Sequence, residues 1–260
     1  MSGIWKNDIY RLLKSPVLFV SMAFAFILPF ALTMILRQDI NIGIGVSGFN
    51  EPTIIAFREM QDIIRMGIQY HTALGVFVAI VVSVFIGQEY QWNTWQHKWI
   101  IGKNRTHIYL SKVVVSCITS AMLFVLFQLV VLLFSGQMGA ILSKEYAVLM
   151  ISGIFVYTAL GAVICMVSML IKNFVVSIVT SLIIVTFSEN LLSLIGNISG
   201  SNEITASIGS WIIRHSIYGM AIRASEVFTI TSMGGIVANS LIIVALSTCI
   251  GLLVFRRYDL

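Results

Sequence analysis

Charged residues are scarce in this chain of 260 residues, since Asp, Glu, Lys and Arg make up only 10% of it while 58% of its residues are hydrophobic. An ordinary soluble domain carries about 25% charged residues. Together with a mean hydropathy of +0.96, this scarcity excludes a soluble globular class and indicates an integral membrane protein. The net charge of +5 comes from Lys and Arg scattered between apolar runs, a pattern typical of membrane topology signals and not of a nucleic-acid groove.

Cysteine is also rare, and this excludes a disulfide framework and a cysteine metal site. Cys117, Cys165 and Cys249 all lie in apolar runs, with no CxxC motif, where a thiol behaves as a small hydrophobic group. We predict no metal site. The GIGVSG stretch beginning at Gly43 formally reads GxGxxG, but no βαβ pattern surrounds it, so it does not indicate a nucleotide site.

Six apolar runs are long enough to cross about 30 Å of hydrocarbon. The first contains twenty uncharged residues and no small-residue cleavage pattern follows it, which favours a span over a secretory signal. Pro29 predicts a kink in that span. The sequence therefore predicts an all-α membrane protein in which residues 17–260 form one six-span domain. The predicted spans are residues 17–36, 68–87, 113–134, 146–171, 174–195 and 234–255.

Residues 1–16 precede the first span and predict a helix lying in the membrane interface. Their apolar residues recur on one helical face, while the basic residues lie largely off it. Pro16 would end this helix, and Trp5 would anchor it at the headgroup level. The apolar face consists of Trp5, Ile9, Leu12 and Leu13.

Six spans place both termini on one side of the membrane. The side of the N-terminus carries ten Lys and Arg residues, and the other side carries six in longer loops. Because short cytoplasmic loops are enriched in Lys and Arg, we expect both termini to be cytoplasmic.

Two long segments, 37–67 and 196–235, then lie outside. Residues 53–67 have a helical pattern that would run into the second span, with Asn50 and Pro52 as cap and first-turn residues. Gly and Ser interrupt the second segment, so we expect short helices lying in or dipping into the outer interface and packing on the ends of the spans.

Glu189 is the one charge within a predicted span. At 1.5 Å per residue it lies about 24 Å from the start of its helix at Phe174, near the outer interface. Two interpretations stay open: a polar helix end, or a site that meets a cationic substrate or a neighbouring Arg. The adjacent Asn190 indicates a hydrated environment under both.

The loop at 88–107 is unusually polar and rich in tryptophan. Its tryptophans recur at i, i+3 and i+7, so on a helix they share one face and anchor it at the inner membrane surface, with the polar side facing the cytoplasm. Gly102 would end this helix, and Thr106 would cap the next one. The tryptophans are Trp92, Trp95 and Trp99, and the polar residues include Glu89, Asn93, Gln96 and His97.

Four residues of this loop, Glu89, Thr94, Arg105 and Lys112, form an E-x4-T-x10-R-x6-K pattern. It resembles the first cytoplasmic loop of type-2 ABC exporter permeases, where such a pattern marks a coupling helix. The ending FRRYDL is similar to the FxxRD-like ending of that family. Asn93 stands where the family often has Gly. Within the family, the chain is most similar to small lantibiotic, bacitracin and cytolytic-peptide exporter permeases.

The resemblance implies a type V ABC exporter-like fold and a role in peptide export by alternating access across a bacterial plasma membrane. The expected partners are a separate ATPase subunit, which would bind ATP and Mg²⁺, and a second permease copy or paralogue. This chain would carry no cofactor, because Gly102-Lys103 lacks the remainder of GxxxxGK[ST]. The residues implied to couple to the ATPase are Glu89, Asn93, Thr94, Gln96, His97, Lys98 and Arg105, and the candidate substrate contacts are Glu189, Asn190 and Trp211.

Other functions remain open at this stage. The coupling loop does not encode cargo, so a glycolipid, a polysaccharide, a drug or sodium is the main alternative. A membrane enzyme would need clustered His, Asp or Glu side chains, and His71 and Glu189 are isolated in the sequence. A secondary transporter would show midplane ionisable sites in two repeated halves, which the sequence does not contain.

Overall fold

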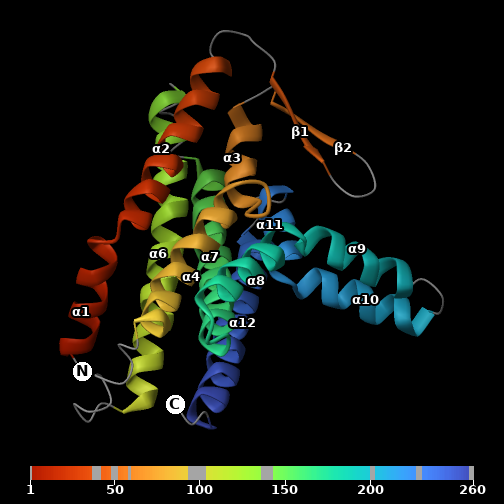
Figure 1. Ribbon diagram of the computed structural model, residues 1–260. Coiled ribbons are helices and arrows are strands. Elements are labelled where there is room, and N and C mark those ends of the chain that lie inside the picture. The colour runs from red at the N-terminus through yellow and green to blue at the C-terminus, as the bar shows by residue number, and fades with distance from the viewer. Residues whose placement is uncertain are drawn as a thin grey trace.

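The computed structural model describes residues 2–36, 42–47, 52–57, 60–92, 104–135, 143–199, 203–226 and 230–257. Apart from short turns and links, these residues are helical except for one antiparallel hairpin of two short strands (Figure 1). The all-α prediction is therefore confirmed for the membrane bundle, to which the structure adds this short hairpin.

In the described part of the chain, five helices are long and apolar enough to cross a membrane. The bent pair α8 and α9 makes a sixth span if the two helices cross the membrane together. With five or six spans, the chain is a multi-pass membrane protein. The five helices are α2 (Pro16–Leu36), α4 (Leu74–Gln91), α6 (Arg105–Ser135), α7 (Lys144–Leu170) and α12 (Ile230–Arg257).

The predicted fifth span is not a straight helix. α8 (Phe174–Thr186) and α9 (Ser188–Ser199) meet at an angle of 60°. The hydroxyl of Ser188 donates to the carbonyl of Val185 at 2.9 Å, a local bond that competes with the regular helical ladder. The apolar run alone did not predict this break, because the polar residues that follow it still fit a helical pattern.

α7 lies in the middle of the bundle, packed against α12, α6, α4 and α11 (Ile217–Glu226). Its apolar window is 67% buried, against 22% for that of α12. α6 and α7 approach closely: a Cβ on Gly161 would lie 2.9 Å from the carbonyl oxygen of Ser116. The stacked rings of Phe124 and Tyr157, 4.9 Å apart, fill the interface further along.

The chain starts with α1 (Ser2–Leu13), which packs against α6 at the edge of the bundle (Figure 1). Pro16 begins α2, where its missing N–H costs nothing. α2 continues as helix through Pro29. The predicted first span, 17–36, agrees with α2 within one residue.

The helix predicted over 53–67 is wrong in its first half. β1 (Ile42–Ser47) pairs with β2 (Pro52–Phe57), with Ile44 opposite Ile55. β-branched side chains fit a paired strand better than a helix surface. Pro52 therefore starts a strand, and only α3 (Met60–Ile68) is helical. A turn over residues 69–73 separates α3 from α4, so the two do not form one helix.

The segment between the fifth and sixth runs contains short helices, as the sequence predicted. α10 (Glu203–His215) runs beside α9, and this pair extends away from the bundle (Figure 1). α11 packs on α7, α12 and α3. α6 begins at Arg105, eight residues before the predicted third span, and Thr106 therefore lies inside the helix and not at its cap.

Candidate functional site

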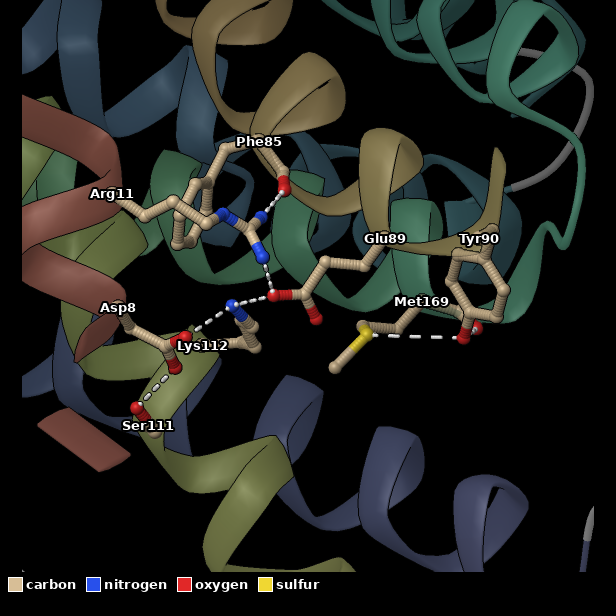
Figure 2. A network of polar contacts seen from close by, with 8 residues as sticks. All are labelled: Asp8, Arg11, Phe85, Glu89, Tyr90, Ser111, Lys112 and Met169. Carbon is tan, nitrogen blue, oxygen red and sulfur yellow. Dashed lines mark hydrogen bonds and ion pairs between the residues drawn. The ribbon is translucent and has the colours of Figure 1, made fainter. Parts of the chain in front are cut away.

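A network of buried charges joins α1, α4 and α6 on the side of the bundle where the N-terminus lies (Figure 2). The ammonium group of Lys112 donates to Asp8 Oδ1 at 2.8 Å and to Glu89 Oε1 at 2.7 Å. The guanidinium of Arg11 donates to the same Glu89 oxygen. Ser111 Oγ donates to Asp8 Oδ2 at 2.7 Å. One carboxylate of α4 thus holds cations from both neighbouring helices.

The network balances its charges. Among the described residues it contains two carboxylates and two cations, and Asp8, Glu89 and Lys112 are fully buried. A buried charge is tolerated only when it is paired and hydrogen-bonded. The ring of Phe85 adds a further favourable contact, because the Lys112 ammonium nitrogen lies 4.1 Å from its centroid. The carbonyl of Phe85 also accepts from Arg11 Nη2 at 3.0 Å.

α7 is joined to the same end of α4. The hydroxyl of Tyr90, next to Glu89, donates to the carbonyl of Met169 at 2.9 Å (Figure 2). The start of α6, the end of α4 and the end of α7 are therefore held together. The ion pairs of Asp8 and Arg11 bind α1 to α6 and α4.

This network surrounds the ends of the polar loop predicted to be a coupling helix. Glu89 lies two residues before the end of α4, and Lys112 lies two turns after the start of α6. The residues between Trp92 and Asn104 lie outside the described part of the chain. The two flanks of the loop are thus joined directly by the Lys112–Glu89 ion pair.

The predicted coupling and anchor residues fall in different places. Glu89 is buried, Arg105 is half-buried at the first position of α6, and Trp92 is 62% exposed at the end of α4. The side chain of Trp5 is outside the described part of the structure. So are Asn93, Thr94, Trp95, Gln96, His97, Lys98 and Trp99.

The α1 half of this network was not predicted from the sequence. Asp8 is the only acidic residue before Asp39, and a lone acid on a basic amphipathic helix is a signal for a buried partner. The loop pattern includes Lys112 but does not indicate its ionic partners. Its role as the cation between two carboxylates required the packing of α1 against α6.

A second polar cluster lies where α9 meets the turn between α3 and α4. The Tyr218 hydroxyl of α11 interacts electrostatically with Glu189, and Glu189 Oε2 lies 3.9 Å from His71 Nε2. The rings of His71 and Tyr218 have centroids 5.0 Å apart. Tyr70 lies next to Ser188, beside the break in the fifth span. The side chain of Glu189 remains 53% exposed.

Burial controls the protonation of this cluster. It lowers the pKa of His71, and the nearby Glu189 carboxylate opposes this only in part. The imidazole is therefore neutral at pH 7, and its contact with Glu189 is not an ion pair at that pH. Burial raises the pKa of Tyr218, and the Glu189 carboxylate raises it further. Glu189 is thus an exposed carboxylate beside two aromatic rings that are both uncharged.

The other two candidate substrate contacts do not join Glu189. Asn190 is half-buried, and its carbonyl accepts from Ser193 at 2.9 Å. Trp211 is 62% exposed on α10 and stacks on His215, with centroids 4.5 Å apart. The structure instead brings His71, Tyr70 and Tyr218 to Glu189, from segments distant in the sequence.

The multi-pass helical bundle defines a membrane-embedded protein, and sequence comparison defines the family. Residues 6–188 match the family described as ABC-2 family transporter protein. The match covers most of the chain, and the chain belongs to this family of ABC transporter membrane subunits. No curated protein matches the chain. Members of the family are transport subunits that normally work with an ATPase partner.

Proposed function

We propose that this chain is the permease subunit of an ATP-driven exporter, driven by a separate ATPase subunit that contacts the 93–103 segment. The observation that carries this proposal is the Lys112–Glu89 ion pair, which joins the two helices flanking that segment. A force applied to the segment would act on both helices together. Because Asp8 and Arg11 belong to the same network, α1 would move with them.

The chain would act as a mechanical element. ATP and Mg²⁺ would be bound by the partner, and closure of two ATPase subunits would move two permease copies, or one copy and a paralogue, as rigid bodies. A buried, hydrogen-bonded network suits this role, since separating its charges within the bundle is costly. In this orientation both termini are cytoplasmic, and the membrane is a bacterial plasma membrane.

We propose an amphipathic peptide, such as a peptide antibiotic or a cytolytic peptide, as the cargo. The spans carry little internal charge, which suits an amphipathic molecule better than an inorganic ion. Glu189 supports this proposal, because an exposed carboxylate beside the rings of His71 and Tyr218 fits an amine with an apolar neighbour. Export would then protect the cell that carries the transporter.

Co-purification with the partner ATPase tests the coupling assignment. Replacing residues 93–98 with a Gly/Ser segment of equal length is expected to abolish retention of the ATPase, while the permease remains in the membrane at its normal level. Glu89→Gln is expected to keep the ATPase bound but to reduce transport-linked ATP hydrolysis. Glu145→Gln, an exposed carboxylate at the start of α7, is the matched control. Full activity of the segment replacement would refute the assignment.

Peptide resistance tests the cargo assignment separately. Glu189→Gln is expected to lower resistance to a cationic amphipathic peptide in cells with normal levels of the complex. Glu226→Gln, an exposed carboxylate at the end of α11, should leave resistance unchanged. Unchanged resistance in Glu189→Gln would remove this residue from the cargo path. ATPase stimulation by a glycolipid and not by peptide would assign the other cargo class.

A further inference from the structure

α1 presents two chemically different faces. One face enters the charge network: Asp8 is buried, Leu12 is 8% exposed and Arg11 bonds to Glu89. The other face is turned away from the protein, with Tyr10 at 57% and Leu13 at 51% exposure. The apolar stripe recognised in the sequence is therefore only partly used for packing within the chain.

The outward face of α1 has an apolar edge and a cationic edge that lie side by side around the helix axis. At 100° per residue, Ile9 and Leu13 form its apolar edge, and Lys6, Tyr10 and Lys14 follow at spacings of four to form a cationic edge. The ammonium group of Lys14 lies 4.5 Å from the Tyr10 ring centroid. Lys6, Tyr10 and Lys14 are all exposed. An apolar edge beside a cationic edge with an aromatic ring is the pattern of a helix lying in a charged bilayer surface.

The position of α1 agrees with such a surface. Two residues, Lys14 and Ser15, separate it from α2, which spans the membrane. α1 is thus held at the end of a span, and α6 covers its opposite side. We propose that the outward face of α1 binds anionic phospholipid headgroups of the leaflet next to the N-terminus.

This contact gives the lipid a route to the charge network. Lys6 of α1 and Lys14, the residue that follows α1, hold the headgroups, while Asp8 and Arg11 of α1 hold Lys112 and Glu89. An attraction that draws α1 toward the headgroups therefore acts on the helices that flank the 93–103 segment. Anionic lipid is an effector of this network, distinct from the cargo.

Local lipid quenching tests the proposal on the purified chain in vesicles and needs no ATPase, so its outcome is independent of the proposed transport function. The three cysteines are replaced by serine, and a bimane dye is attached at Leu13→Cys, on the outward face. Quenching of the bimane fluorescence is then measured in vesicles of brominated phosphatidylglycerol mixed with unlabelled phosphatidylcholine. It is measured again with brominated phosphatidylcholine and unlabelled phosphatidylglycerol. A pair of lysines at an anionic surface predicts a preference of about fivefold or more for phosphatidylglycerol.

Three variants separate charge from structure. Lys6→Gln with Lys14→Gln is expected to abolish the preference, while Lys6→Arg with Lys14→Arg retains it. Lys172→Gln, an exposed cation between α7 and α8, also retains it. Equal quenching by the two lipids before any lysine is changed would overturn the proposal. Absence of quenching by both lipids would overturn it too, because α1 would then be covered by protein, such as a second copy.

Discussion

Lys112, on the helix that follows the polar loop, donates to Glu89, on the helix that precedes it, across 2.7 Å in a fully buried setting. The same ammonium group holds Asp8 of the N-terminal helix. One cation therefore joins three segments that are separated in the sequence, and Arg11 adds a second link between α1 and α4.

Lys112→Met is expected to destabilise the protein strongly, because it leaves two carboxylates buried with one cation fewer. Breaking a buried pair on one side costs about 3–5 kcal/mol. Thermal unfolding in detergent measures the loss. Lys144→Met, an exposed lysine at the start of α7, is the control. Adding Asp8→Asn to Lys112→Met restores the charge balance and should recover part of the lost stability. If the stability losses of the two single variants simply add in the double variant, the network is not coupled.

Gly161→Ala is expected to destabilise the contact between α6 and α7. Its Cβ would lie 2.9 Å from the backbone carbonyl oxygen of Ser116, and helix backbones cannot move apart without losing other contacts. Overpacking of this kind costs about 1–3 kcal/mol. The matched control is Gly234→Ala, in α12, where nothing lies within 4 Å and the change should be neutral or slightly stabilising. Equal unfolding temperatures for the two variants would contradict the close approach.

Ser83→Ala is expected to weaken the junction of α4, α7 and α8. The hydroxyl of Ser83 donates to Ser181 at 2.8 Å and lies 3.1 Å from the hydroxyl of Ser168. Hydrogen bonds between membrane helices contribute about 0.6 kcal/mol on average. Ser177→Ala provides the control, since its buried hydroxyl has no hydrogen-bond partner within the described residues. The first variant should unfold at lower temperature, and the second should match or exceed the wild type.

The stability of the protein is expected to fall in mild acid through His71. Burial places the folded pKa of His71 below its reference value of 6.5, so the unfolded chain binds the proton first as the pH falls. Stability is therefore lost as pH drops from about 6.5 toward the folded pKa. His71→Gln removes this titration next to Glu189, Tyr70 and Tyr218, and should flatten that part of the pH profile. An unchanged slope in His71→Gln would contradict this assignment.

The sequence predicted the class and most of the spans, because long apolar runs and the position of charged residues depend on local composition. α2, α7 and the core of α12 follow the predicted runs closely. The sequence predicted the secondary structure less accurately where the same local pattern fits two different conformations. β2 was assigned to a helix because its pairing with β1 is a contact between distant residues, and the bend at Phe187 lies inside a pattern that a straight helix would also satisfy.

The candidate sites show the same division. The sequence by itself determined that this is a multi-pass membrane protein with a polar loop between two apolar runs, since the cost of burying charge in hydrocarbon leaves few alternatives. Only the tertiary structure decided that Asp8 and Arg11 meet Lys112 and Glu89, and that His71 and Tyr218 meet Glu189. Partners for a buried charge are chosen by which helices pack together, and that choice depends on the shapes of surfaces far apart in the chain.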